Sequence, residues 1–140
     1  MQIRDIMTAG VKTISPNASI QAAAEAMATL EIGLLPVGDN DRLVGMISDR
    51  DLVVRGLCEG VGPEARVGDV MSREVMYCYD DQPTDEVCAN MAELQVRRLP
   101  VVNRDKRLVG IVSLGDLSRL GAAAEETLAK ISQPGGQHSH

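Results

Sequence analysis

The fold is decided by the stretch RLVGMISDRDL, residues 42–52, which returns as RLVGIVSLGDL at residues 107–117. Outward from it, identical residues recur at a spacing of 64 over residues 5–37 and of 65 over residues 42–56. Seventeen positions are identical, whereas ordinary composition gives about three over such a span. The chain is therefore a tandem duplication, which has to be recognised before any element is assigned.

Each copy is predicted to fold into two helices and a small β-sheet. In the first copy, apolar residues recur on one face from Ile20 to Leu30, with Ser19 as a cap, which predicts an amphipathic helix. Strands are expected over residues 34–37 and 42–47, followed by a helix over residues 49–57. The second copy repeats this order with a helix that carries Val87, Met91 and Leu94, strands over residues 98–102 and 107–112, and a helix from Gly115.

The predicted fold class is α/β in the α+β sense, with two tandem repeats packed in pseudo-two-fold symmetry. The expected boundaries are repeat 1 over residues 1–60, a linker over 61–64, repeat 2 over 65–122, a C-terminal helix over 123–131 and a flexible tail over 132–140. A repeat of about 55 residues is marginal alone, whereas two can share a core. We expect a cleft between the halves, which is a favoured place for a small ligand.

Composition excludes several classes of partner. The chain has 140 residues, a formal net charge of −6 and no Phe or Trp, whereas nucleic-acid binding needs clustered Lys and Arg with aromatic rings. No run approaches about 18 uninterrupted apolar residues, and the N-terminus lacks a basic flank before an apolar region. We expect no nucleic acid, no membrane and a cytoplasmic location. Three cysteines without paired spacing indicate reduced thiols.

The repeated motifs form one long pattern that occurs twice in the same order. It comprises Asp5-Ile6-Met7-Thr8, Leu35-Pro36-Val37, residues 42–52, residues 98–102 and residues 107–117. This pattern resembles tandem cystathionine-β-synthase (CBS) domains over about residues 1–122. The stretch Gln95-Val96-Arg97-Arg98 and the short free-standing chain are similar to actinobacterial hypoxic-response CBS-pair proteins. The resemblance implies a regulatory Bateman module that binds adenine nucleotides.

The motif Gly-x-x-Ser-x-x-Asp places Ser48 and Asp51 in the first copy, and Ser113 and Asp116 in the second, where a strand meets a helix. A glycine lets a ligand approach the backbone, and a helix N-terminus favours a phosphate. An Asp one turn into the helix can accept hydrogen bonds from two ribose hydroxyls. The same residues would also cap the helix without any ligand. The CBS resemblance implies ribose contact.

Arg97 and Arg98 precede the Leu-Pro-Val of the second copy, where the first copy has Gly33 and Leu34. A guanidinium suits bidentate phosphate binding, and the resemblance implies that these residues reach the phosphates of the ligand. The alternative is that the two arginines are surface residues that offset part of the acidic net charge and bind no ligand. If nucleotides bind, the two sites should be unequal.

The first strand of each copy is a further candidate. The resemblance implies that Thr13, Ile14 and Pro16 contact the base, and the second copy has Tyr77, Cys78 and Tyr79 in this region. Residues two apart on a strand share a face, so the two tyrosines should point together. They could stack on an adenine, fill the cleft or lie in a dimer interface.

The cysteines are candidates for metal or redox chemistry. Cys58 and Cys78 are weak metal candidates, since thiolates together with the tail residues His138 and His140 would suit Zn²⁺. The close spacing of a zinc site is missing. Cys88 is expected to be buried filler. The sequence requires no cofactor, and zinc binding stays an open alternative.

Two functions stay open at this level. The first is a ligand sensor for AMP, ADP, ATP or S-adenosylmethionine, which forms a homodimeric disc of four CBS units and acts on an unidentified protein partner. The second is a metal- or redox-responsive CBS-pair stress protein with a vestigial nucleotide cleft. An enzyme is not expected, because no nucleophile and base stand at matching positions.

Overall fold

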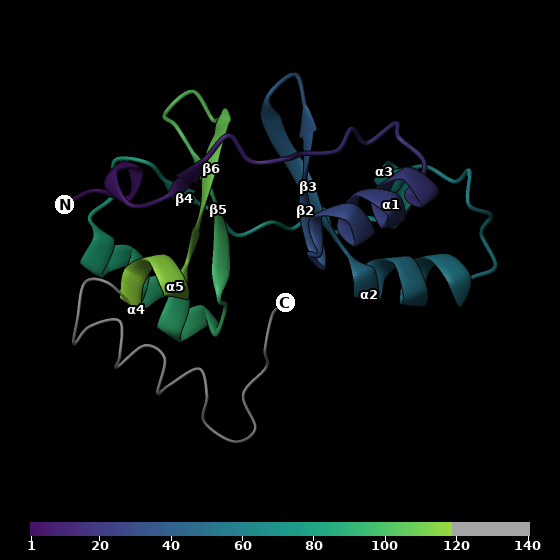
Figure 1. Cartoon of the computed structure of the whole chain (residues 1–140). Coiled ribbons are helices and arrows are strands. Elements are labelled where there is room, and N and C mark those ends of the chain that lie inside the picture. The colour runs from purple at the N-terminus through teal and green to yellow at the C-terminus, as the bar shows by residue number, and fades with distance from the viewer. Residues whose placement is uncertain (119–140) are drawn as a thin grey trace. The chain divides into compact units, whose positions relative to one another are not determined.

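The computed structural model describes residues 1–118 (Figure 1). The expected C-terminal helix (123–131) and tail (132–140) lie outside these residues. The chain divides into a first unit, Lys12–Val75, and a second unit, which is Met1–Val11 with the described part of Met76–His140. Each unit contains the long strands of one copy of the repeat.

The elements follow the predicted order. The first unit contains α1 (Ile20–Leu30), β2 (Leu34–Asp39), β3 (Arg42–Ser48), α2 (Asp49–Asp51), the π-helix η2 (Leu52–Leu57) and α3 (Val67–Val70). The second unit contains the 3-10 helix η1 (Ile3–Asp5), β1 (Thr8–Ala9), β4 (Cys78–Tyr79), α4 (Thr84–Leu94), β5 (Arg98–Val102), β6 (Leu108–Ser113) and α5 (Leu114–Leu117). The predicted mixed class, with a small sheet and helices in each repeat, is confirmed. The helix expected over residues 49–57 changes from α to π geometry at Leu52.

Helix α1 begins where the sequence predicts. The Ser19 hydroxyl oxygen accepts a hydrogen bond of 3.0 Å from a backbone N–H of the first turn, which confirms the predicted cap. Ile20, Ala23 and Met27 are buried, whereas Leu30 is 43% exposed. The buried face of α1 is therefore shorter than the apolar spacing indicates, because the last turn extends beyond the core.

Both copies form an antiparallel hairpin with the same register. Leu34 of β2 pairs with Ser48 of β3, and Arg98 of β5 pairs with Ser113 of β6. In the second unit, β4 joins β5 in parallel and β1 joins β6 antiparallel, which gives the strand order β1-β6-β5-β4. In the first unit, the strand expected near Thr13 is reduced to a single bridge between Ile14 and Val37. Each hairpin is therefore the scaffold of its unit.

The leading segment of each copy, residues 3–9 and 67–73, belongs to the unit that contains the hairpin of the other copy. Ala9 pairs with Gly110 of β6. Likewise, Met46 of β3 and Ser72 exchange backbone hydrogen bonds of 3.0 and 2.8 Å. The repeats of the sequence and the units of the structure therefore have different boundaries.

A glycine in each hairpin allows this close approach. A Cβ on Gly45 would lie 2.6 Å from Met71 Sδ and 2.8 Å from the Ser72 carbonyl oxygen. A Cβ on Gly110 would lie 2.7 Å from Met7 Sδ and 2.7 Å from the carbonyl oxygen of the next residue. Both positions require a residue without a side chain, since another backbone passes over the strand.

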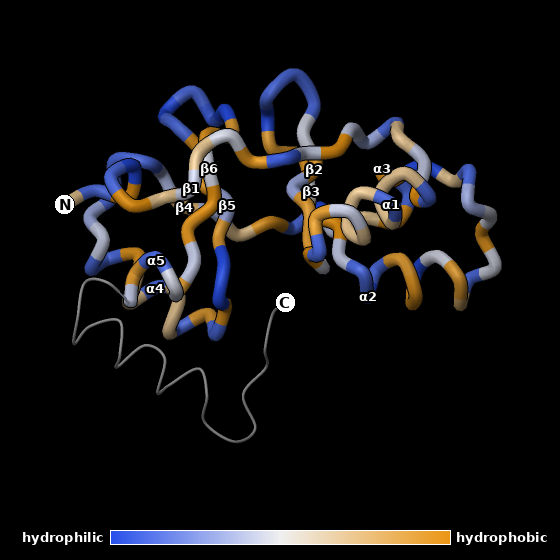
Figure 2. Tube along the Cα trace, in the orientation of Figure 1, coloured by the Kyte–Doolittle hydropathy of each residue, from blue (hydrophilic) through white to orange (hydrophobic). Residues whose placement is uncertain are grey.

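Each unit has its own hydrophobic core. In the first unit, the buried residues are Ile20, Ala23, Met27, Leu35, Val37, Ile47, Val67, Val70 and Met71. In the second unit, they are Ile3, Cys78, Val87, Cys88, Met91, Leu99, Val101, Val112, Leu114 and Leu117. Figure 2 shows the hydrophobic residues along the long strands and polar residues in the turns that join them. Of the helices within residues 1–118, none has the length and apolar character needed to cross a membrane.

We expect Gly45→Ala to lower the free energy of unfolding by about 1–3 kcal/mol, because the added methyl group would push Met71 and Ser72 away from β3. Urea unfolding followed by circular dichroism measures this. Gly38→Ala is the matched control, since its Cβ would lie no closer than 3.7 Å to its nearest neighbour in the same hairpin. Equal unfolding midpoints for the two variants would contradict the close approach.

Candidate functional site

A reciprocal pair of hydrogen bonds joins the predicted Ser and Asp at the end of each hairpin. In the first unit, Ser48 Oγ accepts from Asp51 N at 3.0 Å, and Asp51 Oδ2 accepts from Ser48 N at 2.9 Å. In the second unit, Ser113 and Asp116 form the same pair at 3.1 and 2.9 Å. The capping role is therefore present in both copies. This cap does not use the hydroxyl proton of the Ser, which can be donated to a ribose or phosphate oxygen. It also does not use Oδ1 of the Asp, which can accept a hydrogen bond from a ribose hydroxyl.

Three candidate side chains of the second unit share the sheet face opposite its helices, which we call the β-face. Cys78 pairs with Val101, and both belong to the core. Because side chains alternate along a strand, Tyr79 points to the β-face. Arg98 lies three residues before Val101 and points the same way, together with its partner Ser113.

The β-face of the first unit carries uncharged residues instead. Ile14 is bridged to Val37 and packs against the core, so the neighbouring Thr13 points to the β-face. Leu34 and Ser48 are paired and point there as well. The second unit thus adds an Arg where the first has Leu34.

Arg97 and Arg98 lie at the end of the hairpin, next to α5. The Arg97 carbonyl oxygen accepts a hydrogen bond of 3.0 Å from Leu114 N. Both arginines are exposed, and successive residues of a strand point to opposite faces. Arg98 is the first residue of β5 and lies on the β-face, and Arg97 directly precedes the strand.

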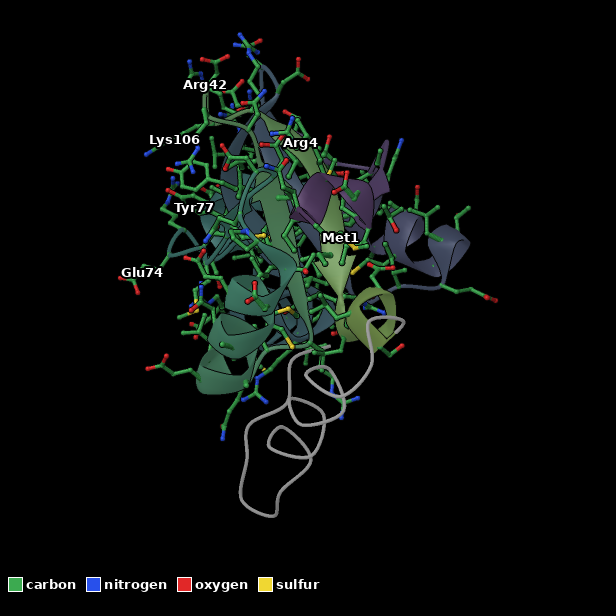
Figure 3. All side chains as sticks on the ribbon, turned by 90° about the vertical axis from the view of Figure 1, so that its left-hand side faces the viewer. Met1, Arg4, Arg42, Glu74, Tyr77 and Lys106 are labelled. Carbon is green, nitrogen blue, oxygen red and sulfur yellow. The ribbon has the colours of Figure 1, made fainter. Side chains whose placement is uncertain are left out.

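The two tyrosines point together, as the sequence predicts. Their ring centroids lie 5.7 Å apart with an interplanar angle of 81°, an edge-to-face contact. Tyr77 precedes β4 and is 40% exposed (Figure 3). Its ring is therefore available to a ligand or to another protein.

Tyr79 is held by a residue that sequence reasoning missed. The guanidinium carbon of Arg104 lies 4.1 Å from the centroid of the Tyr79 ring. Arg104 also donates two hydrogen bonds of 2.8 Å to Asp81, from Nε to Oδ2 and from Nη2 to Oδ1. These hydrogen bonds hold the pKa of Asp81 below its ordinary value. One face of Tyr79 is thus already covered. No spacing predicts this contact, because the β5–β6 turn brings Arg104 to β4.

The remaining candidates of the first strands are turned inward. Cys78 is 3% exposed, and burial, with a smaller contribution from Asp80, raises the pKa of its thiol to about 12. Ile14 N and its carbonyl oxygen both bond to β2. The Pro16 carbonyl oxygen accepts a hydrogen bond of 2.8 Å from Gly68 N, which attaches it to the leading segment of the second copy. The side chains of Ile14 and Cys78 therefore pack in the cores.

Arg55 is a second residue that sequence reasoning missed. Its Nη1 donates to the Met71 carbonyl oxygen at 3.1 Å, and its Nε lies 4.0 Å from Asp51 Oδ1. Arg55 thus connects the candidate ribose carboxylate with the leading segment packed on β3. The spacing of four residues from Asp51 was a signal for the ion pair, whereas the contact with Met71 depends on tertiary packing.

No metal-binding cluster of three or more His, Cys, Asp or Glu side chains is present among residues 1–118. Cys58 is exposed, whereas Cys78 and Cys88 are buried, which confirms the expectation that Cys88 fills the core. The tail histidines, His138 and His140, lie outside the described residues. The described part of the chain therefore does not by itself form a zinc site of the usual kind.

The two hairpins, each of which ends in the same Ser–Asp pair, identify the protein as a tandem pair of one small α+β domain. The family model of the CBS domain matches residues 3–56 and 67–123. The chain belongs to the CBS domain family, with two CBS domains in tandem, and the predicted resemblance is confirmed.

Relatives of this chain include a hypoxic response protein. Hypoxic response protein 1 of Mycobacterium tuberculosis is 42% identical over 118 residues, which cover 83% of this chain and 82% of that protein. A crystal structure of Hypoxic Response Protein I with two coordinated zinc ions has a TM-score of 0.76 and 41% identity, covering 86% of this chain and 98% of that one. The similarity to hypoxic-response CBS pairs is thereby confirmed.

Two other similar structures contain adenosyl ligands. CBSX2 in complex with AMP has a TM-score of 0.73 and 30% identity, covering 85% of this chain and 94% of that one. The CBS domain pair of protein MJ0100, in complex with 5′-methylthioadenosine and S-adenosyl-L-methionine, has a TM-score of 0.70 and 31% identity, covering 86% and 94%.

We expect only Cys58 of the three thiols to react with a disulfide reagent in the native protein at pH 8. Cys78 and Cys88 should react after unfolding, because they are buried and Cys78 stays protonated. Since the pKa of Cys78 is raised from 9.0 to about 12, its contribution to stability is present below pH 9 and is lost as the pH rises toward 12. Thiol titration before and after adding denaturant measures the two classes. Three rapidly reacting thiols would contradict the structure.

Proposed function

We propose that the protein is a non-catalytic regulatory CBS pair that binds an adenosyl nucleotide such as AMP, ADP or ATP and signals to a separate protein partner. The observation that carries this proposal is the β-face of the second unit, where Tyr79, Arg98 and Ser113 share one side of one sheet. Asp116 is hydrogen-bonded to Ser113 at the end of that face. This arrangement offers an aromatic ring, a cation and a sugar-binding carboxylate together.

The spacing along the sheet supports a ligand of nucleotide length. Tyr79 is paired with Val102, four residues beyond Arg98 on β5. At about 3.3 Å per residue, the two positions lie about 13 Å apart along the strand, which is comparable to an extended nucleotide. The adenine would contact Tyr77, whose ring is exposed, while Arg98 would bind phosphate and Asp116 the ribose hydroxyls.

The similar structures support the same class of ligand. CBSX2 holds AMP, and the CBS pair of MJ0100 holds 5′-methylthioadenosine and S-adenosyl-L-methionine. These ligands share the adenosine group and differ in their 5′ substituents. An adenosyl group is therefore the common element that we assign to this chain.

Regulation requires that the ligand favour one of two arrangements of the protein. Arg55 supplies a connection for this, because it lies between Asp51 Oδ1 and the Met71 carbonyl oxygen. A ribose that hydrogen-bonds Asp51 competes with Arg55 for the carboxylate. Ligand binding in the first unit would thereby alter how the leading segment is held on β3.

The protein would act as a homodimer, in a disc of four CBS units. The exposed apolar residues of η2 support this, since Val53, Val54 and Leu57 are 50%, 44% and 75% exposed. Apolar side chains gathered on one short helix are typical of a surface that pairs with a second copy.

We expect AMP and ATP to change the tyrosine fluorescence in a saturable way. The chain has two Tyr and no Trp, so the emission reports on Tyr77 and Tyr79. Arg98→Leu and Asp116→Asn should each weaken binding at least about tenfold, because a hydrogen bond to a charged group is lost or weakened. Titration calorimetry gives a second readout.

The control for this prediction is Arg73→Leu, which removes an exposed positive charge outside the candidate site and should leave the affinity unchanged. The absence of both heat and fluorescence change with AMP, ADP, ATP and S-adenosylmethionine at millimolar concentration would overturn the proposed function.

We expect Leu57→Glu to convert a dimer into a monomer, because it introduces a charge at the most exposed apolar residue of η2. Sedimentation velocity at micromolar concentration measures the mass. Met76→Glu is the control, since Met76 is 53% exposed but lies in the second unit. A wild-type monomer, or a dimer that survives Leu57→Glu, would contradict this assignment.

The second candidate function is the metal- or redox-responsive stress protein. It is favoured by the two zinc ions in the structure of Hypoxic Response Protein I and by the exposed thiol of Cys58. Zinc bound through Cys58 would protect this thiol until a chelator is added, so the thiol titration separates the two candidates. Stoichiometric zinc in untagged protein purified without chelator would support the second.

A further inference from the structure

The two hairpins end in corners with matching backbones. These corners comprise residues 31–34 with 48–51 in the first unit, and residues 95–98 with 113–116 in the second. Asp49 N donates to the Gly33 carbonyl oxygen at 2.9 Å, as Leu114 N donates to that of Arg97 at 3.0 Å. The two hydrogen bonds of the Ser–Asp pair also have nearly the same lengths in both corners. They are 3.0 and 2.9 Å in the first unit and 3.1 and 2.9 Å in the second. Differences between the corners therefore lie in the side chains.

The charges of the two corners have opposite signs. In the first unit, the charged residues are Glu31, Asp49, Arg50 and Asp51. In the second unit, they are Arg97, Arg98 and Asp116. The first corner thus contains three carboxylates and one guanidinium group, whereas the second contains two guanidinium groups and one carboxylate.

The position of Gly33 shows where the two corners differ in charge. Its φ is not positive, so the backbone does not require glycine. A Cβ at this position would lie 2.8 Å from Asp49 Oδ2. The Asp49 carboxylate therefore lies where, in the second unit, the side chain of Arg97 begins. A phosphate in the first corner would meet a carboxylate in place of a guanidinium.

We propose that the two units select different adenosyl ligands. The second unit binds adenosine with a 5′-phosphate, and the first binds an adenosyl compound whose 5′ substituent is neutral or positively charged, such as a thioether or a sulfonium. This inference rests on the proposed function and assigns a ligand class to each of its sites. Its physical basis is charge-assisted hydrogen bonding to phosphate in one corner and like-charge repulsion of phosphate in the other.

The test uses AMP and 5′-methylthioadenosine as probes, titrated calorimetrically into the full chain with a chelator present. We expect one AMP per chain in the wild type. The double variant Arg97→Gly, Arg98→Leu, which installs the residues of the first corner, should weaken AMP binding at least about tenfold and leave 5′-methylthioadenosine unchanged. Asp51→Asn should show the reverse pattern. Arg73→Leu controls for the loss of a positive charge elsewhere.

The converse variant is Gly33→Arg, Leu34→Arg, Asp49→Leu, which installs the residues of the second corner in the first unit. It should create a second AMP site per chain. Its urea unfolding midpoint shows whether it folds. If it does not fold, Asp49→Leu alone serves as the test, and it should allow AMP to compete with 5′-methylthioadenosine in the first unit.

Two AMP sites of equal affinity in the wild type would overturn this inference while leaving the proposed function intact. So would a folded converse variant, or Asp49→Leu in its place, that gains no AMP binding in the first unit. Absence of binding by AMP and 5′-methylthioadenosine as well as by the other adenosyl ligands would overturn both.

Discussion

The contact on which the structure depends is that between a leading methionine segment and the glycine of a hairpin from the other copy. Met71 packs over Gly45 and Met7 packs over Gly110, so closely that a Cβ on either glycine would overlap the methionine sulfur. The backbone hydrogen bonds between Met46 and Ser72 extend β3 on a side that would otherwise be an unpaired edge. Because each unit needs a segment of the other copy, neither copy completes its own sheet.

This constraint also determines the surroundings of the candidate site. The same strand that contacts Ser72 ends at Ser48, whose hydroxyl oxygen and backbone N–H are engaged with Asp51. Arg55 lies between this carboxylate and the Met71 carbonyl oxygen. The residues that cap a short helix are thus connected to the leading segment through one ion pair, from Asp51 to Arg55, and one hydrogen bond, from Arg55 to the Met71 carbonyl oxygen. A ligand at Asp51 would act on the contact that completes the first unit.

Duplication has kept the backbone and changed the chemistry. The Ser–Asp pairs have nearly the same geometry in both units, because they are needed for capping whether or not a ligand is present. The side chains around them differ, with Asp49 beside Gly33 in one unit and Leu114 beside Arg97 in the other. The only aromatic rings of the chain, Tyr77 and Tyr79, lie in the second unit. Positions that do not serve the fold have been able to diverge.

The sequence by itself determined the local structure. Helix α1 with its Ser19 cap, both hairpins and the proximity of Ser to Asp follow from periodicity, turn residues and a three-residue spacing, which act within one stretch of chain. It also predicted that Tyr77 and Tyr79 meet. Tertiary structure alone decided that the leading segments complete the other copy's sheet, that Arg104 covers Tyr79, and that Cys78 is buried with a raised pKa. These features join residues far apart in the chain, and their partners are set by packing, for which no local pattern is a signal.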